Sequence, residues 1–257
     1  MIEVLSPAEV ERGRKTGALV GDILHELKGR TKPGTNLLEI DRWAKQLIEA
    51  AGAVSCYVDY APSFGSGPFG HYICTGVNDA VLHAKPTDLR LAAGDLLTLD
   101  LAVLLDGVAA DAAISFVVGG GGDAESLALI AATERALAAG IAAVVPGART
   151  GDISHAIGEV LRGEGYAVNT DFGGHGIGTT MHQDPHIPND GRPGRGFPLR
   201  PGMLLAIEPW VMADTDVLVT DADGWTLRSQ TGCRTAHTEH TIAITEAGAE
   251  ILTRPTR

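Results

Sequence analysis

The chain repeats a short pattern that ends in an acidic residue. The segment GDLLTLD ends at Asp100 and the segment GMLLAIE ends at Glu208, and each runs from a glycine through an apolar stretch to its acid. A second acid follows in both places, because Asp111 begins DAAISFVV and Glu239 begins EHTIAIT. Repetition of this kind predicts two related units that pack against each other.

An earlier part of the chain repeats as well, at a constant shift. Its markers are Pro33-Gly34, Ile40 and Gly52 in the first copy, and Pro146-Gly147, Ile153 and Gly165 in the second. We therefore expect one domain over residues 1–257, with internal halves at about 1–120 and 123–257 related by an approximate twofold axis. The glycine run 119–122 is the expected flexible joint between them.

Composition excludes several classes of protein. With 257 residues and 44% hydrophobic content the chain can bury a large core. A formal net charge of −12 argues against nucleic acid as a partner, since phosphate binding needs concentrated Lys and Arg. The longest apolar region, 127–145, contains Glu134 and Arg135 and fails as a membrane span. The acidic N-terminus is unlike a signal peptide, and three cysteines without CxxC spacing fit a reducing cytoplasm.

Helical and strand-like segments alternate in blocks. Four segments carry apolar residues at helical spacing, and these are 8–28, 37–51, 124–145 and 153–163. Strand-like segments broken by Gly and Pro occupy 53–83, a hairpin joins 96–105 to 108–118, and further strands reach Thr245. Paired helices and paired strands predict an α+β fold, in which helices cover one face of an antiparallel sheet.

The hairpin brings two of the acids together. Asp106-Gly107 is a strong signal for a two-residue turn, which places Ala102 opposite Asp111. Side chains alternate with period two, so Asp100 lies on the same face and becomes a diagonal neighbour of Asp111, about 7–8 Å away at the backbone. The alternative is an ordinary strand-edge acid and a capping residue. That alternative buries two unpaired carboxylates, which is costly, so a shared metal site is favoured.

Histidines supply the remaining candidate ligand. A histidine between glycines, such as His175 in FGGHGIG, is more often a loop residue, but His182 follows closely and four acids need a partner. We interpret His186 as a loop residue and His240, on the strand face opposite to Glu239, as structural. No role is predicted for the others, which are His25, His71, His155 and His237.

The motifs together resemble type I methionine aminopeptidase in the short form of bacteria. They are NDAVLH, which ends at His83, LLTLD, AAD, GHGIG, MHQDPH, AIEP, DGW with Trp225, and TEHT, in the order and spacing of that family. The resemblance implies the pita-bread fold, a curved antiparallel sheet with two helix pairs about a pseudo-twofold axis. It also implies one catalytic metallopeptidase domain that removes the initiator methionine from nascent polypeptides.

Site residues follow from the resemblance by motif. The implied ligands of two divalent cations are Asp100, Asp111, His175, Glu208 and Glu239, with Asp111 and Glu239 bridging. His83 and His182 are implied to hold the substrate and stabilise the transition state, while Glu208 transfers the proton of the attacking water. Four carboxylates and one imidazole favour Mn²⁺, Fe²⁺ or Co²⁺ over a thiolate-rich structural zinc site, although zinc as a catalytic ion stays open.

The resemblance also implies a pocket for the methionine thioether, lined by Phe69, Cys74, Met181 and Trp225. The expected partner is the N-terminus of a peptide or nascent polypeptide, which the protein encounters transiently at the ribosome. Binding to nucleic acid or to a membrane is not expected. Two departures stand out. Ala84-Lys85 follows His83 where the family has Gly and an apolar residue, and Ala112-Ala113 follows Asp111 where hydroxyl side chains are common.

Two alternatives to this activity remain. The first is an Xaa-Pro aminopeptidase or prolidase-like metallopeptidase of the same fold. The second is a catalytically inactive module that binds peptides; such modules typically lose metal ligands, and all five are present here.

Overall fold

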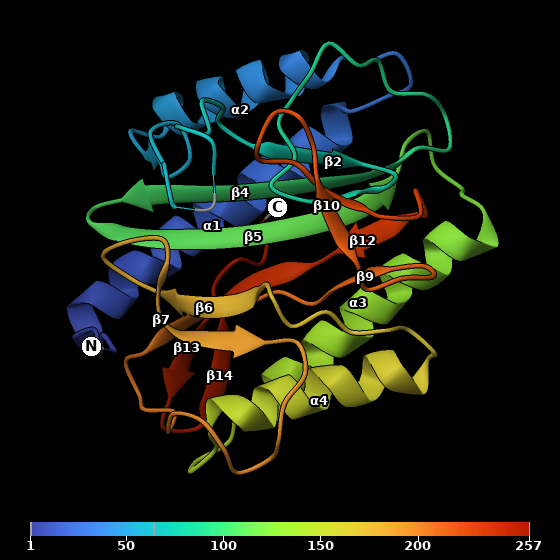
Figure 1. The fold of residues 1–257 in the computed structure, drawn as a ribbon. Coiled ribbons are helices and arrows are strands. Elements are labelled where there is room, and N and C mark those ends of the chain that lie inside the picture. Colours follow the sequence, from blue (N-terminus) through green and yellow to red (C-terminus); the bar gives the residue numbers. More distant parts are fainter. Residues whose placement is uncertain (1, 64, 257) are drawn as a thin grey trace.

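The computed structural model describes residues 2–63 and 65–256, which form an α+β fold (Figure 1). The helices in this part of the chain are α1 (Pro7–Arg30), α2 (Leu37–Ala50), α3 (Ala124–Ala142) and α4 (Thr150–Gly163). Among the described residues, none of the helices combines the length and apolar character that a membrane crossing requires. Each half of the chain thus contributes one helix pair, as the repeat predicts.

The strands form one large antiparallel sheet and two small ones. The large sheet contains β1 (Val54–Ser55), β4 (Leu96–Leu105), β5 (Val108–Val117), β13 (Glu239–Thr245), β8 (Leu204–Ile207), β6 (Gly173–Ile177) and β7 (Gln183–Pro188), in that order. Strand β2 (Cys74–Val77) pairs with β4, and β14 (Gly248–Ile251) pairs with β13. One small sheet contains β10 (Leu218–Thr220), β11 (Leu227–Ser229) and β3 (Ala80–Leu82), in that order. The other contains β12 (Thr235–His237) and β9 (Trp210–Met212).

The two halves meet where β5 pairs with β13. This seam contains two residue pairs, Glu239 with Ala113 and His240 with Ala112. A side chain extends it: Thr241 Oγ1 accepts a hydrogen bond from the backbone N–H of Asp111 (2.9 Å) and donates one to the Asp111 carbonyl (2.8 Å). The alignment of the two central strands is therefore held by backbone and side chain together.

Alternation along the strands separates the core from the opposite face of the sheet. On β4, Leu97, Leu99 and Leu101 are fully buried against α1 and α2, in one cluster with Ile23 and Ile40. The second half repeats this arrangement, with the apolar faces of α3 and α4 packed on β8 and β13 (Figure 1). The intervening residues of the same strands consequently point away from the helices.

The sequence repeat reappears in the backbone. Gly94 and Gly202, which open the two repeated segments, have nearly equal φ angles of +90° and +91°. The helix-opening turns also match, since Gly34 and Gly147 both adopt positive φ. Only glycine populates this region readily, which explains why these residues recur in both halves.

Most predicted boundaries are confirmed within a few residues. The hairpin turn at Asp106-Gly107 has two positive φ angles, as a type I′ turn requires, and Ser6 caps α1 through a reciprocal capping box with Glu9. The third helix ends at Ala142, short of the predicted end, because Pro146 disfavours continuation. The prediction of broken strand-like segments over residues 53–83 is confirmed in part, since β1, β2 and β3 lie there but are short, and an irregular segment separates β1 from β2.

Helix α1 approaches the C-terminal segment closely at Gly17. A Cβ at this position would stand 2.6 Å from the carbonyl oxygen of Leu252, whereas a Cβ at Gly29 of the same helix would meet nothing within 4 Å. We predict that Gly17→Ala lowers the free energy of unfolding by about 1–3 kcal/mol through overpacking. Gly29→Ala should instead raise it by up to about 1 kcal/mol, because alanine favours the helix. Denaturant titration of both variants checks this, and equal effects would contradict the close approach.

Candidate functional site

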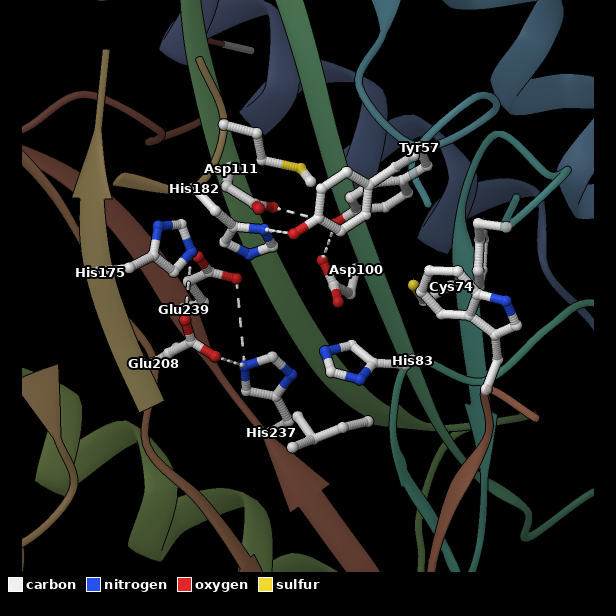
Figure 2. A pocket seen from close by; sticks show the side chains of 15 residues that line it. Tyr57, Cys74, His83, Asp100, Asp111, His175, His182, Glu208, His237 and Glu239 are labelled. Carbon is white, nitrogen blue, oxygen red and sulfur yellow. Dashed lines mark hydrogen bonds and ion pairs between the residues drawn. The ribbon is translucent and has the colours of Figure 1, made fainter. Parts of the chain in front are cut away.

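Four carboxylates and one imidazole converge on the sheet face turned away from the helices (Figure 2). Asp100 lies on β4 and Asp111 on β5, and the register pairs Ala102 with Asp111, as the hairpin argument predicts. Glu239 begins β13, Glu208 directly follows β8, and His175 lies on β6. Each half of the chain therefore contributes acids at the seam, and the five predicted ligand residues do meet.

The donor atoms form overlapping groups. One group is Asp100, Asp111 and Glu239, another is His175, Glu208 and Glu239, and the ligand atoms within each lie within 4.8 Å of one another. Glu239 belongs to both. A third group joins His182 to Asp111 and His175, so this histidine also lies within reach of a cation.

Burial makes this collection of acids electrostatically costly. Desolvation raises the pKa of Asp100 to about 6, and it raises the pKa of Asp111 and Glu239 well above their ordinary values. Desolvation is also the largest cause of the raised pKa of Glu208. Repulsion from Asp111 and Asp100 raises this pKa further. A carboxylate cluster of this kind is stable in ionised form only with a compensating positive charge.

The donor set fits divalent cations. Glu239 Oε1 is buried and has no hydrogen-bond partner among the described residues. The remaining donors are carboxylate oxygens and an imidazole nitrogen, which suit Mn²⁺, Fe²⁺ or Co²⁺. The nearby Cys74 adds no thiolate to this set, because burial raises the pKa of its thiol well above the usual value.

An apolar pocket adjoins the acids in the same cavity, which encloses about 480 Å³ including its open mouth. All four side chains predicted for the methionine pocket line it, and all four are almost fully buried: Phe69 (3%), Cys74 (6%), Met181 (6%) and Trp225 (3%). The rings of Phe69 and Trp225 pack edge to face at 5.2 Å. The structure therefore brings together the four side chains that the resemblance implies, and their contact with a methionine side chain stays a prediction.

Both predicted catalytic histidines face the cavity. Burial lowers the pKa of His83 to about 4, so this imidazole is neutral near pH 7. His182 is exposed at the mouth, its ring packs 4.2 Å from that of His175, and its Nδ1 lies 2.7 Å from the hydroxyl of Tyr60. The hydrogen bond between Tyr60 and Nδ1 fixes the orientation of the His182 ring, and with it the direction in which Nε2 points.

Sequence reasoning missed four residues of the cavity, Tyr57, Tyr60, Leu82 and His237. His237, for which no role is predicted, lies beside the acids. Its side chain is 2% exposed, and its Nε2 lies 3.9 Å from a carboxylate oxygen of Glu208 and 4.0 Å from one of Glu239. Period-two alternation from Glu239 could have placed His237 on the same face. The tyrosines lie in an irregular segment, where no periodicity identifies their direction.

Two other histidine interpretations have clear outcomes. His186 lies on β7 and lines a groove beside the cavity, so its interpretation as a loop residue is wrong. His240 lies on the helix-facing side of the sheet, where its Nδ1 contacts Thr253 Oγ1 at 2.8 Å, in keeping with a structural role.

The two departures from the family pattern have structural counterparts. Lys85 places its ammonium group over the rings of Phe69 (5.7 Å) and Trp225 (5.6 Å), against the aromatic wall of the pocket. Ala113 pairs with Asp100 and offers no hydroxyl. The hydroxyl group near the acids comes instead from Tyr57, whose oxygen lies 2.5 Å from Asp100 Oδ1.

A comparison with known families accounts for this arrangement. The model of Metallopeptidase family M24 matches residues 11–246. The chain belongs to metallopeptidase family M24. M24 peptidases use divalent metal, which agrees with the acid and histidine groups of the cavity.

Relatives within the family are methionine aminopeptidases. The chain is 41% identical to the methionine aminopeptidase of Clostridium acetobutylicum, covering 98% of this chain and 99% of the relative. It is 40% identical to methionine aminopeptidase 1 of Mycobacterium tuberculosis, covering 96% and 93%. The resemblance found in the sequence is therefore confirmed.

Solved structures of M24 peptidases confirm the pita-bread fold. The methionine aminopeptidase of Thermotoga maritima superposes with a TM-score of 0.93 at 36% identity, covering 99% of this chain and 100% of that one. Prolidase from Pyrococcus furiosus superposes with a TM-score of 0.77 at 19% identity, covering 99% of this chain and 66% of the prolidase. The second likeness reflects the fold alone.

The buried acids predict a pH-dependent stability for the metal-free protein. A carboxylate whose pKa is raised on folding binds extra protons in the folded state, so its contribution to stability falls as pH rises from its unfolded pKa through its folded one. For Asp100 this window runs from 3.8 to about 6. Between pH 4 and 6.5, metal-free wild type should lose stability relative to Asp100→Asn.

Divalent cations should reverse this loss. Mn²⁺ at 100 times its Kd should stabilise wild type by about 2.7 kcal/mol, and the gain should be larger at pH 7.5 than at pH 5, because protons compete for the ligands. Thermal unfolding with chelator and with Mn²⁺, for wild type and Asp100→Asn, measures both effects. A melting temperature indifferent to Mn²⁺ at pH 7.5 would count against the metal site.

Proposed function

We propose that this chain removes the N-terminal methionine from new polypeptides by metal-dependent hydrolysis. One observation carries the proposal: the acid and histidine cluster and the apolar, sulfur-containing and aromatic pocket share one cavity. A methionine side chain packed against Phe69 and Trp225 would bring its own peptide bond beside the acids, because both rings line the same cavity. Identity of about 40% to methionine aminopeptidases over nearly the whole chain supports the same conclusion.

We infer that the site holds two divalent cations. Glu239 belongs to both ligand groups, which supports a bridging position, and Asp111 is the second bridging residue that the resemblance implies. His175 and Glu208 would complete one position and Asp100 the other. When bound, the cations supply the Lewis acidity that activates water and polarises the scissile carbonyl.

The chain's own residues handle the proton and the developing charge. Glu208 is the proposed general base, which takes the proton of the attacking water and delivers it to the leaving nitrogen. His182 and His83 flank the cavity and would donate hydrogen bonds to the carbonyl oxygen and align the peptide nitrogen. Neutral imidazoles suit this task, since each has one N–H to donate.

We propose that residues 1–257 act as one catalytic domain, because the five proposed ligands come from both halves and neither half contains all of them. The proposed substrate is the N-terminus of a peptide or nascent polypeptide, encountered transiently near the ribosome. A cytoplasmic location fits the three cysteines, which are all free.

A peptide panel tests the activity. Metal-stripped protein is loaded in turn with Mn²⁺, Fe²⁺, Co²⁺ or Zn²⁺ and given Met-Ala-Ser, Leu-Ala-Ser and Ala-Pro-Ser. We predict release of methionine from the first peptide, loss of activity with chelator, and recovery with added cation. Release of the residue before proline as the preferred reaction would favour the prolidase-like alternative. Binding of all peptides without hydrolysis under any metal would favour the inactive module.

Removal of the shared carboxylate should abolish metal binding and activity together. Glu239→Gln keeps the size of the side chain and removes its charge, so kcat/KM should fall more than about 100-fold, beyond the range for residues that only support ligands. Glu246→Gln, an exposed acid after the same strand, is the matched control and should behave as wild type. Metal content by mass spectrometry and peptide hydrolysis provide the readouts, and full turnover by Glu239→Gln would contradict the site.

A further inference from the structure

Tyr57 places a hydroxyl group between two of the proposed ligands. Its oxygen lies 2.5 Å from Asp100 Oδ1 and 3.2 Å from Asp111 Oδ1. The side chain is 7% exposed, and its ring packs edge to face on Phe69 at 5.7 Å. Figure 2 shows the phenol oxygen directed at Asp100. Neither the motifs nor the comparisons assign this residue a role.

The backbone on both sides fixes Tyr57 opposite β4. Ser55 pairs with Val103, the N–H of Cys56 donates to the carbonyl of Ala102 (3.1 Å), and the N–H of Tyr57 donates to Ser55 Oγ (3.1 Å). Ala102 stands on the same face of β4 as Asp100, and its small side chain packs in one cluster with Tyr57. The phenol therefore reaches the carboxylates from an anchored position.

The hydrogen bond has one direction. With cations bound the two carboxylates are ionised and can only accept, so the phenol is the donor, and its single proton is shared between two acceptors with Asp100 the nearer. Such a donor reduces the repulsion between the two carboxylates and restricts the rotamer of each. Besides Asp111, the thiol of Cys74 also contacts Asp100, and a thiol is a weak donor.

We propose that Tyr57 is a positioning residue that orients Asp100 and Asp111 for one of the two cation positions. The inference rests on the proposed function. Partners that hydrogen-bond to metal ligands typically change metal affinity by about 10–100-fold. Tyr57 contacts the group made by Asp100, Asp111 and Glu239, and it makes no hydrogen bond to His175 or Glu208. The two cation positions should consequently respond differently to its loss.

The variant Tyr57→Phe tests this directly, because it keeps the ring and removes the hydroxyl. Full-length protein is stripped with chelator and titrated with Mn²⁺ in a calorimeter. We expect wild type to show two binding events, and Tyr57→Phe to weaken one of them by about 10–100-fold while the other is retained. Activity on Met-Ala-Ser should fall at limiting Mn²⁺ and recover in excess Mn²⁺, whereas purely structural damage would not be rescued by metal.

Tyr72→Phe is the matched control for the metal titration. It removes a hydroxyl from the same segment between β1 and β2, but Tyr72 packs against the helix-covered core and does not line the cavity. Its Mn²⁺ titration should match wild type, and the melting temperature of both metal-free variants checks folding. Wild-type affinity at both positions of Tyr57→Phe, or equal weakening of both, would overturn the role of Tyr57. Absence of any Mn²⁺ binding by wild type would instead overturn the proposed function.

Discussion

Burial of four carboxylates on one sheet face is the constraint on which this structure depends. Ionised acids without counter-charge are costly in a folded protein, yet Asp100, Asp111, Glu208 and Glu239 lie together where the halves of the chain join. Apolar packing on the opposite face of the same strands has to offset this unfavourable free energy. The helix pairs do so by covering both halves of the sheet with fully buried leucine and isoleucine side chains.

Much of this arrangement could be predicted because it repeats or alternates. The hairpin turn at Asp106-Gly107 fixes the register, and the register fixes which side chains share a face with Asp100. The hairpin argument brought Asp100 and Asp111 together, and the family resemblance added the other three proposed ligands and the aromatic wall at Phe69 and Trp225, all of which line one cavity.

The parts that could not be predicted lie outside regular structure. The segment between β1 and β2 has no period, so the direction of Tyr57 and Tyr60 depends on tertiary contacts that local sequence does not encode. His237 is an exception, because it lies on β12 and alternation from Glu239 indicates its face, although not its distance from the acids. Lys85 is a third case, because its stacking over two rings depends on residues distant in the chain.

The side-chain link between Thr241 and Asp111 has a consequence for how this family can vary. A slip of β13 by one residue would turn Glu239 toward the helices and bring His240 into the cavity, since successive side chains face opposite ways. The Thr241 hydroxyl matches both backbone groups of Asp111 in a single alignment, so it penalises that slip. An insertion or deletion of one residue within β5 or β13 would therefore separate the Thr241 hydroxyl from Asp111 and turn the proposed ligands beyond it away from the cavity.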